Sequence, residues 1–441
     1  MSYHFSHFYK LDTTESIDDY MREMFEDVLS NCHIDTKELF LNVTPEKTDV
    51  QKHTNNLQTF VDECKKKFPQ LKIFMIFNKP MIENQEINFK NVDGMLVLDL
   101  YVLLVYDKMI SMKENPSWNP INEKILFPTR RSSTLHRIGL LKRLFDRGMR
   151  NDVIWSLNDY RTASVLGFTP TEYINQCQEN LPGMSFDEVK RFIRDNTKTI
   201  VDQDEGHKKA LDYGFSVDPN FFTSHIGQIV TETFFDEAGP HHLSEKTWSA
   251  MSRHLPFVLF AQEGVVDRLK KMGFHTFDDI DISTNIYKVT QDLGTLLRNG
   301  VDPIIFFQRT HHCDRFREFY KSFKGPSWPE DVSWQDLKVL PINIQEEIIT
   351  NFFSEEEIRT AIRFQSLIHS VVHFKEAVIN RKNEVEKMVK QNVERFSNLG
   401  KECQSTVKRF ISNNTIELNY SEFIKNLYEV PSWYGSDVTV K

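Results

Sequence analysis

The chain has 441 residues, a formal net charge of −9 and 40% hydrophobic residues. This length is enough for two or three domains with hydrophobic cores of their own, and the composition is typical of a globular protein rather than a disordered one. The negative net charge argues against a protein that coats nucleic acid over its whole surface, because phosphate binding needs concentrated positive charge. Five cysteines occur singly, which argues against a disulfide framework and a zinc ribbon.

The sequence shows no targeting segment and no membrane span. Its N-terminus lacks the charged and apolar regions of a signal peptide. The nearest apolar run, residues 94–106, contains Asp99 and is shorter than the roughly 20 residues that cross a bilayer. We therefore expect a cytoplasmic protein.

The first part of the chain, residues 1–120, alternates helical and strand-like patterns. Apolar spacing predicts helices at 16–31 and 56–68, followed by a buried strand at 71–77. The apolar run 94–106 fits either one long strand or a helix, since periodicity alone does not separate the two. These patterns indicate a first α/β domain.

After a linker rich in Pro and Asn at 113–124, the alternation becomes regular. A strand at 124–130, a helix at 134–148 ended by Gly148 and a strand at 152–158 predict a βαβ unit. A second run follows: strand 225–233, helix 244–254, strand 256–260, helix 264–273 and a short strand 274–277. We assign 121–310 to a Rossmann-like domain. Residues 311–441 form a helical region expected to pack back on the body.

The loop from Glu232 to the helix at Ser244 carries a candidate site. In open parallel sheets, ligands bind where loops leave the carboxyl ends of strands and enter helices. Ser244 can cap the helix, and its backbone N–H groups with Lys246 suit a diphosphate. Glu245 or Glu232 can accept hydrogen bonds from ribose or sugar hydroxyls. Ser-Glu-Lys is equally an ordinary helix start, so the motif alone does not choose between these interpretations.

Three segments resemble a known family. Glu-Lys-Thr-Trp at 245–248, after a strand and an acidic loop and before "PFVLF", is similar to the donor-binding half of GT-B glycosyltransferases, especially the fucosyltransferase-like ones. "TLHRIGLLKRLFDRGM" from Thr134 resembles the His-Arg helix of phage and bacterial nucleotide-sugar transferases. "GVVDRLKKMGFHTFDDIDIS" from Gly264 resembles the segment that follows their donor helix. The resemblance covers about residues 125–300.

This resemblance implies an α/β fold of GT-B type, with two Rossmann-like domains facing a cleft and a helical C-terminal extension. The implied activity is transfer of a hexosyl or pentosyl group from a nucleoside diphosphate sugar to an acceptor hydroxyl, with neither metal nor other cofactor. The domain 1–120 would present the acceptor. The implied donor-binding residues are Arg137, Glu232, Ser244, Glu245, Lys246 and Thr247, with Arg131, His136, Glu237, His241 and His242 as further donor-loop residues.

The acceptor and the catalytic base stay open at this point. A saccharide is one acceptor class; a hydroxymethylated base in phage DNA is the other, because the segment 130–150 carries seven Lys or Arg residues against one Asp. An inverting mechanism would need an Asp or Glu from the first domain as general base, which the sequence does not identify.

Other residue patterns in the sequence give weaker evidence of a function. The pairs Asp202/Asp204 and Asp279/Asp281 fit the Asp-x-Asp of metal-dependent transferases, but such pairs arise by chance among 63 acidic residues. The run His311-His312-Cys313 hints at zinc, yet adjacent side chains diverge on a helix, so we predict no metal. The alternative to an enzyme is a non-catalytic helical interaction protein on a transferase-like scaffold.

Overall fold

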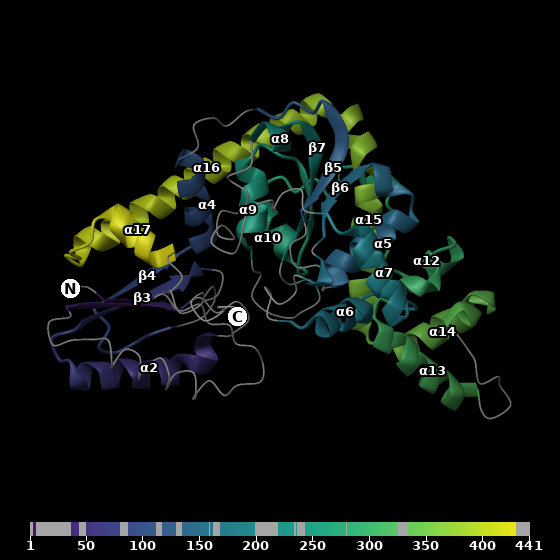
Figure 1. Cartoon of the computed structure of the whole chain (residues 1–441), viewed down its shortest axis with the longest axis horizontal. Coiled ribbons are helices and arrows are strands. Elements are labelled where there is room, and N and C mark those ends of the chain that lie inside the picture. The colour runs from purple at the N-terminus through teal and green to yellow at the C-terminus, as the bar shows by residue number, and fades with distance from the viewer. Residues whose placement is uncertain are drawn as a thin grey trace.

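The computed structural model shows a mixed α/β protein (Figure 1). It describes residues 3–5, 37–43, 50–79, 87–111, 117–128, 135–157, 159–161, 168–198, 219–232, 235, 243–278, 280–324 and 334–428. Within these residues the strands form two parallel sheets of four strands each. The helix predicted at 16–31 lies outside the described residues. Parallel sheets are normally buried on both faces by helices, which is the arrangement expected of a Rossmann-like fold.

The first sheet has the strand order β1-β2-β3-β4, and all neighbouring strands are parallel. Its strands are β1 (Tyr3–Phe5), β2 (Glu38–Val43), β3 (Lys72–Asn78) and β4 (Gly94–Leu98). Helix α2 (Val50–Lys67) joins β2 to β3, as the sequence predicts. It ends just before Pro69, a residue that cannot continue a helix.

The apolar run 94–106 is neither one strand nor one helix but a strand followed directly by a helix. Strand β4 ends at Leu98, and α4 (Leu100–Ser111) starts two residues later. The carboxylate of Asp99 accepts a hydrogen bond from the backbone N–H of Val102 at 3.2 Å, so this residue caps the helix. The single acidic residue in the run is therefore the point at which the backbone changes conformation.

The second sheet has the order β6-β5-β7-β8, again parallel throughout. The predicted strands are confirmed as β5 (Asn122–Pro128), β6 (Val153–Ser156), β7 (His225–Thr231) and β8 (Phe257–Phe260). The predicted helices are confirmed as η1 (Leu135–Gly139) continued by α5 (Leu140–Asp146), α9 (Glu245–Ser252) and α10 (Val265–Lys271). The chain ends this first helical segment at Gly148, whose φ of 79° suits glycine.

The order of these strands creates a topological switch point. From β5 the chain passes to β6 on one side, whereas β7 lies on the other side of β5 and the chain moves on from it to β8. The loops that leave β5 and β7 therefore diverge at the carboxyl edge of the sheet. In open parallel sheets this is the place where ligands bind.

The short strand predicted at 274–277 is wrong, because this segment pairs with no strand. The backbone N–H and C=O of His275 bond instead to the side-chain amide of Asn392 on α16 (Lys382–Asn413), both at 2.8 Å. Phe277 then takes a φ of 59°, which interrupts an extended chain. A distant side chain thus satisfies the backbone groups that a strand neighbour would have satisfied.

The remaining described chain is helical, as predicted from about residue 285 onward. Between β6 and β7 lie α6 (Pro170–Glu179), α7 (Phe186–Asn196) and α8 (Pro219–Thr223). After α10 come η5 (Ile282–Thr284), α11 (Ile286–Val289), α12 (Leu293–Arg298), η6 (Pro303–Phe306), α13 (Thr310–Lys324), η7 (Trp334–Val339), α14 (Ile342–Phe352), α15 (Glu355–Asn380), α16 (Lys382–Asn413) and α17 (Tyr420–Tyr428). No helix among the described residues is long and apolar enough to cross a bilayer.

Helix α16 connects the two halves of the molecule (Figure 1). Near its middle, Phe396 stacks on Trp248 of α9 with ring centroids 5.9 Å apart. Towards its end, Phe410 meets Phe74 of β3 at 5.7 Å. Buried residues of both sheets, α4, α9, α16 and α17 belong to one continuous hydrophobic cluster. The relative position of the two sheets is therefore set by apolar packing along α16.

One close contact in this packing is testable. A Cβ atom at Gly400 of α16 would overlap the ring of Tyr106 on α4. Alanine is the better helix former by about 1 kcal/mol, but overpacking a core costs roughly 1–3 kcal/mol. We expect Gly400→Ala to lower the free energy of unfolding in urea, whereas Asn398→Ala, at an exposed position of the same helix, leaves it unchanged or raises it. Equal stability of the two variants would contradict the close packing of α4 against α16.

Candidate functional site

The candidate site lies at the switch point between β5 and β7. The π-helical turn η1 places His136 and Arg137 after β5, and both are buried, with 3% and 5% of their surface exposed. Glu232 follows β7 directly and is 1% exposed. The Nε2 atom of His136 lies 2.5 Å from the backbone oxygen of Glu232. This hydrogen bond joins the two diverging loops.

The side chain of Glu232 holds the start of α9. Its Oε1 accepts hydrogen bonds from the backbone N–H of Ser244, at 3.1 Å, and from the hydroxyl of Thr247. A carboxylate at this end of a helix is stabilised by the helix dipole. Its Oε2 is buried and has no hydrogen-bond partner in the described part of the chain. Glu232 therefore has a positioning role that the sequence alone did not indicate, beside any contact with a ligand.

The first residues of α9 form a small polar cluster. Ser244 is the N-cap, as predicted, and its hydroxyl accepts from the backbone N–H of Lys246 at 3.3 Å. The ammonium group of Lys246 lies 3.2 Å from the same hydroxyl and 3.2 Å from the carboxylate of Glu245. The side chain of Lys246 keeps 31% of its surface exposed. Of the cations at the switch point, this one is placed to meet a ligand from solvent.

The electrostatics of His136 show how much positive charge gathers here. Burial lowers the pKa of His136 well below its usual value, and the charge of Arg137 lowers it further. Lys246 and Arg363 act in the same direction, while the bond to the backbone of Glu232 opposes them. His136 is therefore neutral at neutral pH, and its Nε2–H donates to the carbonyl of Glu232.

Arg363, on α15, was missed in the sequence. Its guanidinium donates hydrogen bonds to the backbone oxygens of Phe235, in the loop after β7, and Ala261, directly after β8. It also lies over the Phe235 ring, 4.1 Å from the centroid, and His136 stacks on that ring at 5.9 Å. Helix α15 has the pattern of an ordinary amphipathic helix, so no local signal sets Arg363 apart.

The other predicted donor-loop residues cannot be placed. Arg131, Glu237, His241 and His242 all lie outside the described residues. The structure thus brings together Arg137, His136 and Glu232 with the start of α9, namely Ser244, Glu245, Lys246 and Thr247.

The basic segment 130–150 does not form one face in its described part. Arg137 is buried at the switch point. Lys142 pairs with Asp146 on its own helix at 2.5 Å. Arg150 lies over the rings of Phe145 and Trp155, at 5.0 and 5.7 Å. These cations point to different environments, so they do not make a continuous track for a phosphate backbone.

The alternative metal motifs have other partners where they are described. On α13, His311 bonds to Glu179, and His312 lies 3.8 Å from Glu357. Asp281 accepts a hydrogen bond from Ser283 at 2.9 Å. Asp202, Asp204 and Asp279 lie outside the described residues. In the described part of the chain, no three His, Cys, Asp or Glu side chains are grouped closely enough to hold a metal ion.

A second polar group lies at the carboxyl edge of the first sheet. Asp99, between β4 and α4, is 6% exposed, and burial raises its pKa to about 6. The positive charges of Arg268, on α10, and of Lys79, after β3, lower this pKa. Arg268 belongs to the second half of the chain. Its effect on Asp99 shows that this half lies close enough to the edge of the first sheet for their charges to interact. In the sequence, Asp99 stood out only as an interruption of an apolar run.

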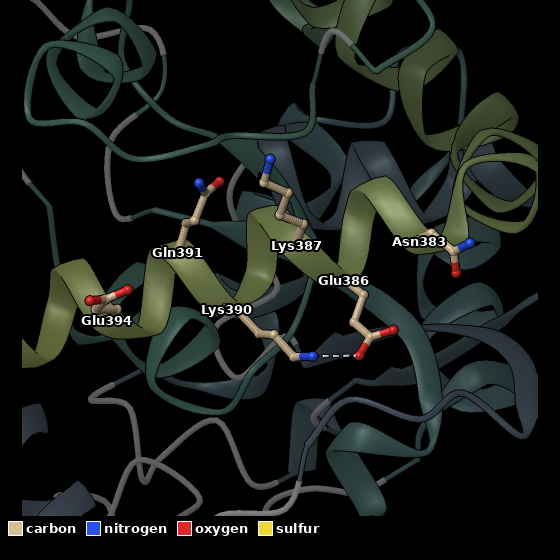
Figure 2. Close-up of a pocket in the computed structure, with 6 residues that line it drawn as sticks. All are labelled: Asn383, Glu386, Lys387, Lys390, Gln391 and Glu394. Atoms are coloured by element: carbon tan, nitrogen blue, oxygen red, sulfur yellow. Dashed lines mark hydrogen bonds and ion pairs between the residues drawn. The ribbon is translucent and has the colours of Figure 1, made fainter.

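A surface pocket of about 390 Å³ lies elsewhere, on one face of α16. Figure 2 shows side chains of α16 that line this pocket. Among them, the ammonium group of Lys390 lies 2.8 Å from the carboxylate of Glu386. The lining residues are Asn383, Glu386, Lys387, Lys390, Gln391 and Glu394. Two lysines and two glutamates balance one another on an open helix surface, which gives a charged ligand no preference for this face.

Comparison with protein-family models, with curated proteins and with solved structures found no match for this chain. Its function is therefore inferred from the chemistry of the switch point.

The buried imidazole predicts a pH dependence. Because the pKa of His136 is lower in the folded state, the unfolded chain binds more protons below about pH 6.5, and stability falls as pH decreases from there. One such group changes the free energy of unfolding by up to about 1.4 kcal/mol per pH unit. We expect the free energy of unfolding, measured in urea at pH 7.5, 6.5 and 5.5, to fall less with decreasing pH for His136→Gln than for the native chain.

His275→Gln is the matched control, because His275 bonds to Gln391 in an exposed contact. This variant should follow the native curve. If His136→Gln follows it as well, the imidazole of His136 is not buried in its neutral form.

Proposed function

We propose that the chain is a glycosyltransferase that moves a sugar from a nucleoside diphosphate sugar to an acceptor hydroxyl without a metal ion. The observation that carries this proposal is the gathering of Arg137, Lys246 and Arg363 around the neutral His136, at the carboxyl ends of β5 and β7. Switch points of parallel sheets are nucleotide sites, and clustered cations bind phosphate. In the proposed GT-B-like arrangement, the second sheet holds the donor and the first sheet presents the acceptor.

The chemistry of the step fits these residues. As the bond from the sugar to the diphosphate breaks, negative charge grows on the leaving group and positive charge on the sugar ring. Fixed cations stabilise the departing diphosphate most strongly in a site that excludes water. Lys246 is partly exposed and close to the helix start, so it would contact the diphosphate directly. The carboxylate of Glu245 would accept hydrogen bonds from ribose or sugar hydroxyls.

Asp99 is the residue that we propose as general base. A base works best when its pKa lies near the working pH, and burial raises the pKa of Asp99 to about 6. It lies at the carboxyl edge of the first sheet, between β4 and α4, and in the proposed arrangement this sheet presents the acceptor. In this role it would take the proton of the acceptor hydroxyl while the sugar is transferred.

A saccharide is the favoured acceptor. DNA would need a continuous basic face, whereas in the segment 130–150 Arg137 is buried, Lys142 is paired with Asp146 and Arg150 lies over an aromatic ring. A cytoplasmic location agrees with cysteines that occur singly, since thiols stay reduced there.

Donor binding is tested by calorimetry with UDP, GDP and CDP and with their sugar derivatives. We expect one class of nucleotide to bind the native chain and Lys246→Ala to weaken this binding at least about tenfold, since a charge-assisted contact to phosphate is lost. Lys142→Ala removes a cation that pairs on its own helix, and it should bind like the native chain. Failure of every nucleotide to bind would contradict the enzyme and favour the non-catalytic interaction protein.

The role of Asp99 is tested by Asp99→Asn. Asparagine is as good a helix cap as aspartate, so α4 and the fold should be kept, but the amide cannot accept a proton. We expect nucleotide affinity to stay unchanged while the rate of sugar transfer falls by about 10²–10⁴, the usual contribution of a general base. Both quantities are measured on the donor and acceptor pair that the native chain uses. An unchanged rate would exclude Asp99 as the base.

A further inference from the structure

Two histidines on α15 lie one helical turn apart. His369 and His373 occupy positions i and i+4, which share one face of a helix. Their ring centroids are 4.3 Å apart. The same spacing lets two imidazoles on a helix bind one zinc ion in the His-x-x-x-His motif.

The imidazole of His369 is held in the way a metal ligand is held. Its Nε2 atom is buried and, among the residues that the structure describes, has no hydrogen-bond partner. Burial and the nearby His373 lower the pKa of His369, whereas a hydrogen bond to the backbone of Thr284 raises it. Since Nε2 has no partner there, the bond to Thr284 involves the other ring nitrogen, Nδ1, and leaves Nε2 open to a ligand. Metal-binding histidines are commonly fixed by such a bond from their other nitrogen.

We propose that His369 and His373 bind one divalent transition-metal ion, with Nε2 of His369 and the imidazole of His373 as ligands and water in the remaining positions. Imidazole nitrogen favours Cu²⁺, Ni²⁺ and Zn²⁺ over Mg²⁺ and Ca²⁺. The residue after His369 is Ser370, so the site lacks the glutamate that makes His-Glu-x-x-His a hydrolytic centre. The ion would stabilise structure and take no part in the proposed sugar transfer.

Neighbouring charges and the number of protein ligands determine how tightly this pair of histidines would bind a metal ion. The charge of Asp281 favours a cation near His369, and that of Arg147 opposes it. The ring of Tyr287, on α11, packs edge-on against His369 at 6.2 Å. No third protein ligand of the usual kinds is grouped with the pair in the part of the chain that the structure describes. Two protein ligands give an exchangeable site, and the bound ion would tighten the contact of α15 with the segment 284–287.

The experiment uses the full chain, freed of metal with a chelator and then dialysed at pH 7.5. Titration with ZnCl₂ and NiCl₂ in a calorimeter should show one equivalent bound, and ZnCl₂ should raise the melting temperature. His369→Ala and His373→Ala should each weaken binding at least about tenfold, because each removes one of two protein ligands. His373→Gln is a second, milder variant should an alanine variant fail to fold.

The double variant His311→Ala/His312→Ala is the matched control, since it removes two adjacent histidines of another helix. It should bind zinc like the native chain. Titration with Cu²⁺ adds a spectroscopic signature, a visible absorption band of nitrogen-bound copper that His369→Ala should shift or abolish. The proposal is overturned if the native chain binds neither ion, or if His369→Ala/His373→Ala binds zinc as the native chain does.

Discussion

The switch point is organised around one buried carboxylate. The backbone oxygen of Glu232 accepts from His136, and its side chain holds the start of α9 through Ser244 and Thr247. A carboxylate that is almost fully buried is costly unless hydrogen bonds and opposite charges surround it. The helix start supplies the hydrogen bonds, through the backbone N–H of Ser244 and the hydroxyl of Thr247. Glu232 therefore joins the exits of β5 and β7 to the first turn of α9.

In the same arrangement, the described residues of the site carry more positive than negative charge. Burial lowers the pKa of His136, and Arg137, Lys246 and Arg363 lower it further, so the imidazole stays neutral and donates one hydrogen bond. Glu245 pairs with Lys246, and Glu232 is engaged at the helix start. Among the residues that the structure describes, three cations close to two carboxylates favour a further anion over a cation or an apolar ligand. A diphosphate carries the charge that this surplus would attract, which links the geometry to the proposed donor.

The sequence predicted the second sheet well and its long-range contacts poorly. Strands β5, β7 and β8 are short segments with apolar and β-branched residues between turn signals, and the cap at Ser244 is a local motif, so both can be predicted from neighbouring residues. The segment 274–277 also follows a helix that ends at a glycine, yet its backbone is satisfied by Asn392, more than a hundred positions along the chain. Arg363 was missed for the same reason, because its partners Phe235 and Ala261 are distant in sequence.

The residues of the candidate site show the same difference between local and long-range signals. The residues from Ser244 to Lys246 could be predicted because helix capping uses adjacent residues. Asp99 could not, because its raised pKa comes from burial in the assembled fold, where α16, formed much later in the chain, lies against it. Its backbone oxygen lies 4.0 Å from the thiol of Cys403, on α16. A local pattern shows that an acidic residue caps a helix, but only the assembled fold decides whether its carboxyl group holds a proton near neutral pH.

Helix α16 therefore has a part in the proposed chemistry although it carries none of the donor residues. The proposed base belongs to the first sheet and the cations to the second, so a reaction requires a defined distance between them. That distance depends on α16, which packs Phe396 on Trp248 at one point and Phe410 on Phe74 at another. Aromatic contacts of this kind resist displacement because close-packed cores tolerate little change in volume. A change near Phe410, away from the contact of α16 with α9, would thus alter the proposed sugar transfer more than the proposed nucleotide binding, since the proposed donor residues lie at the second sheet.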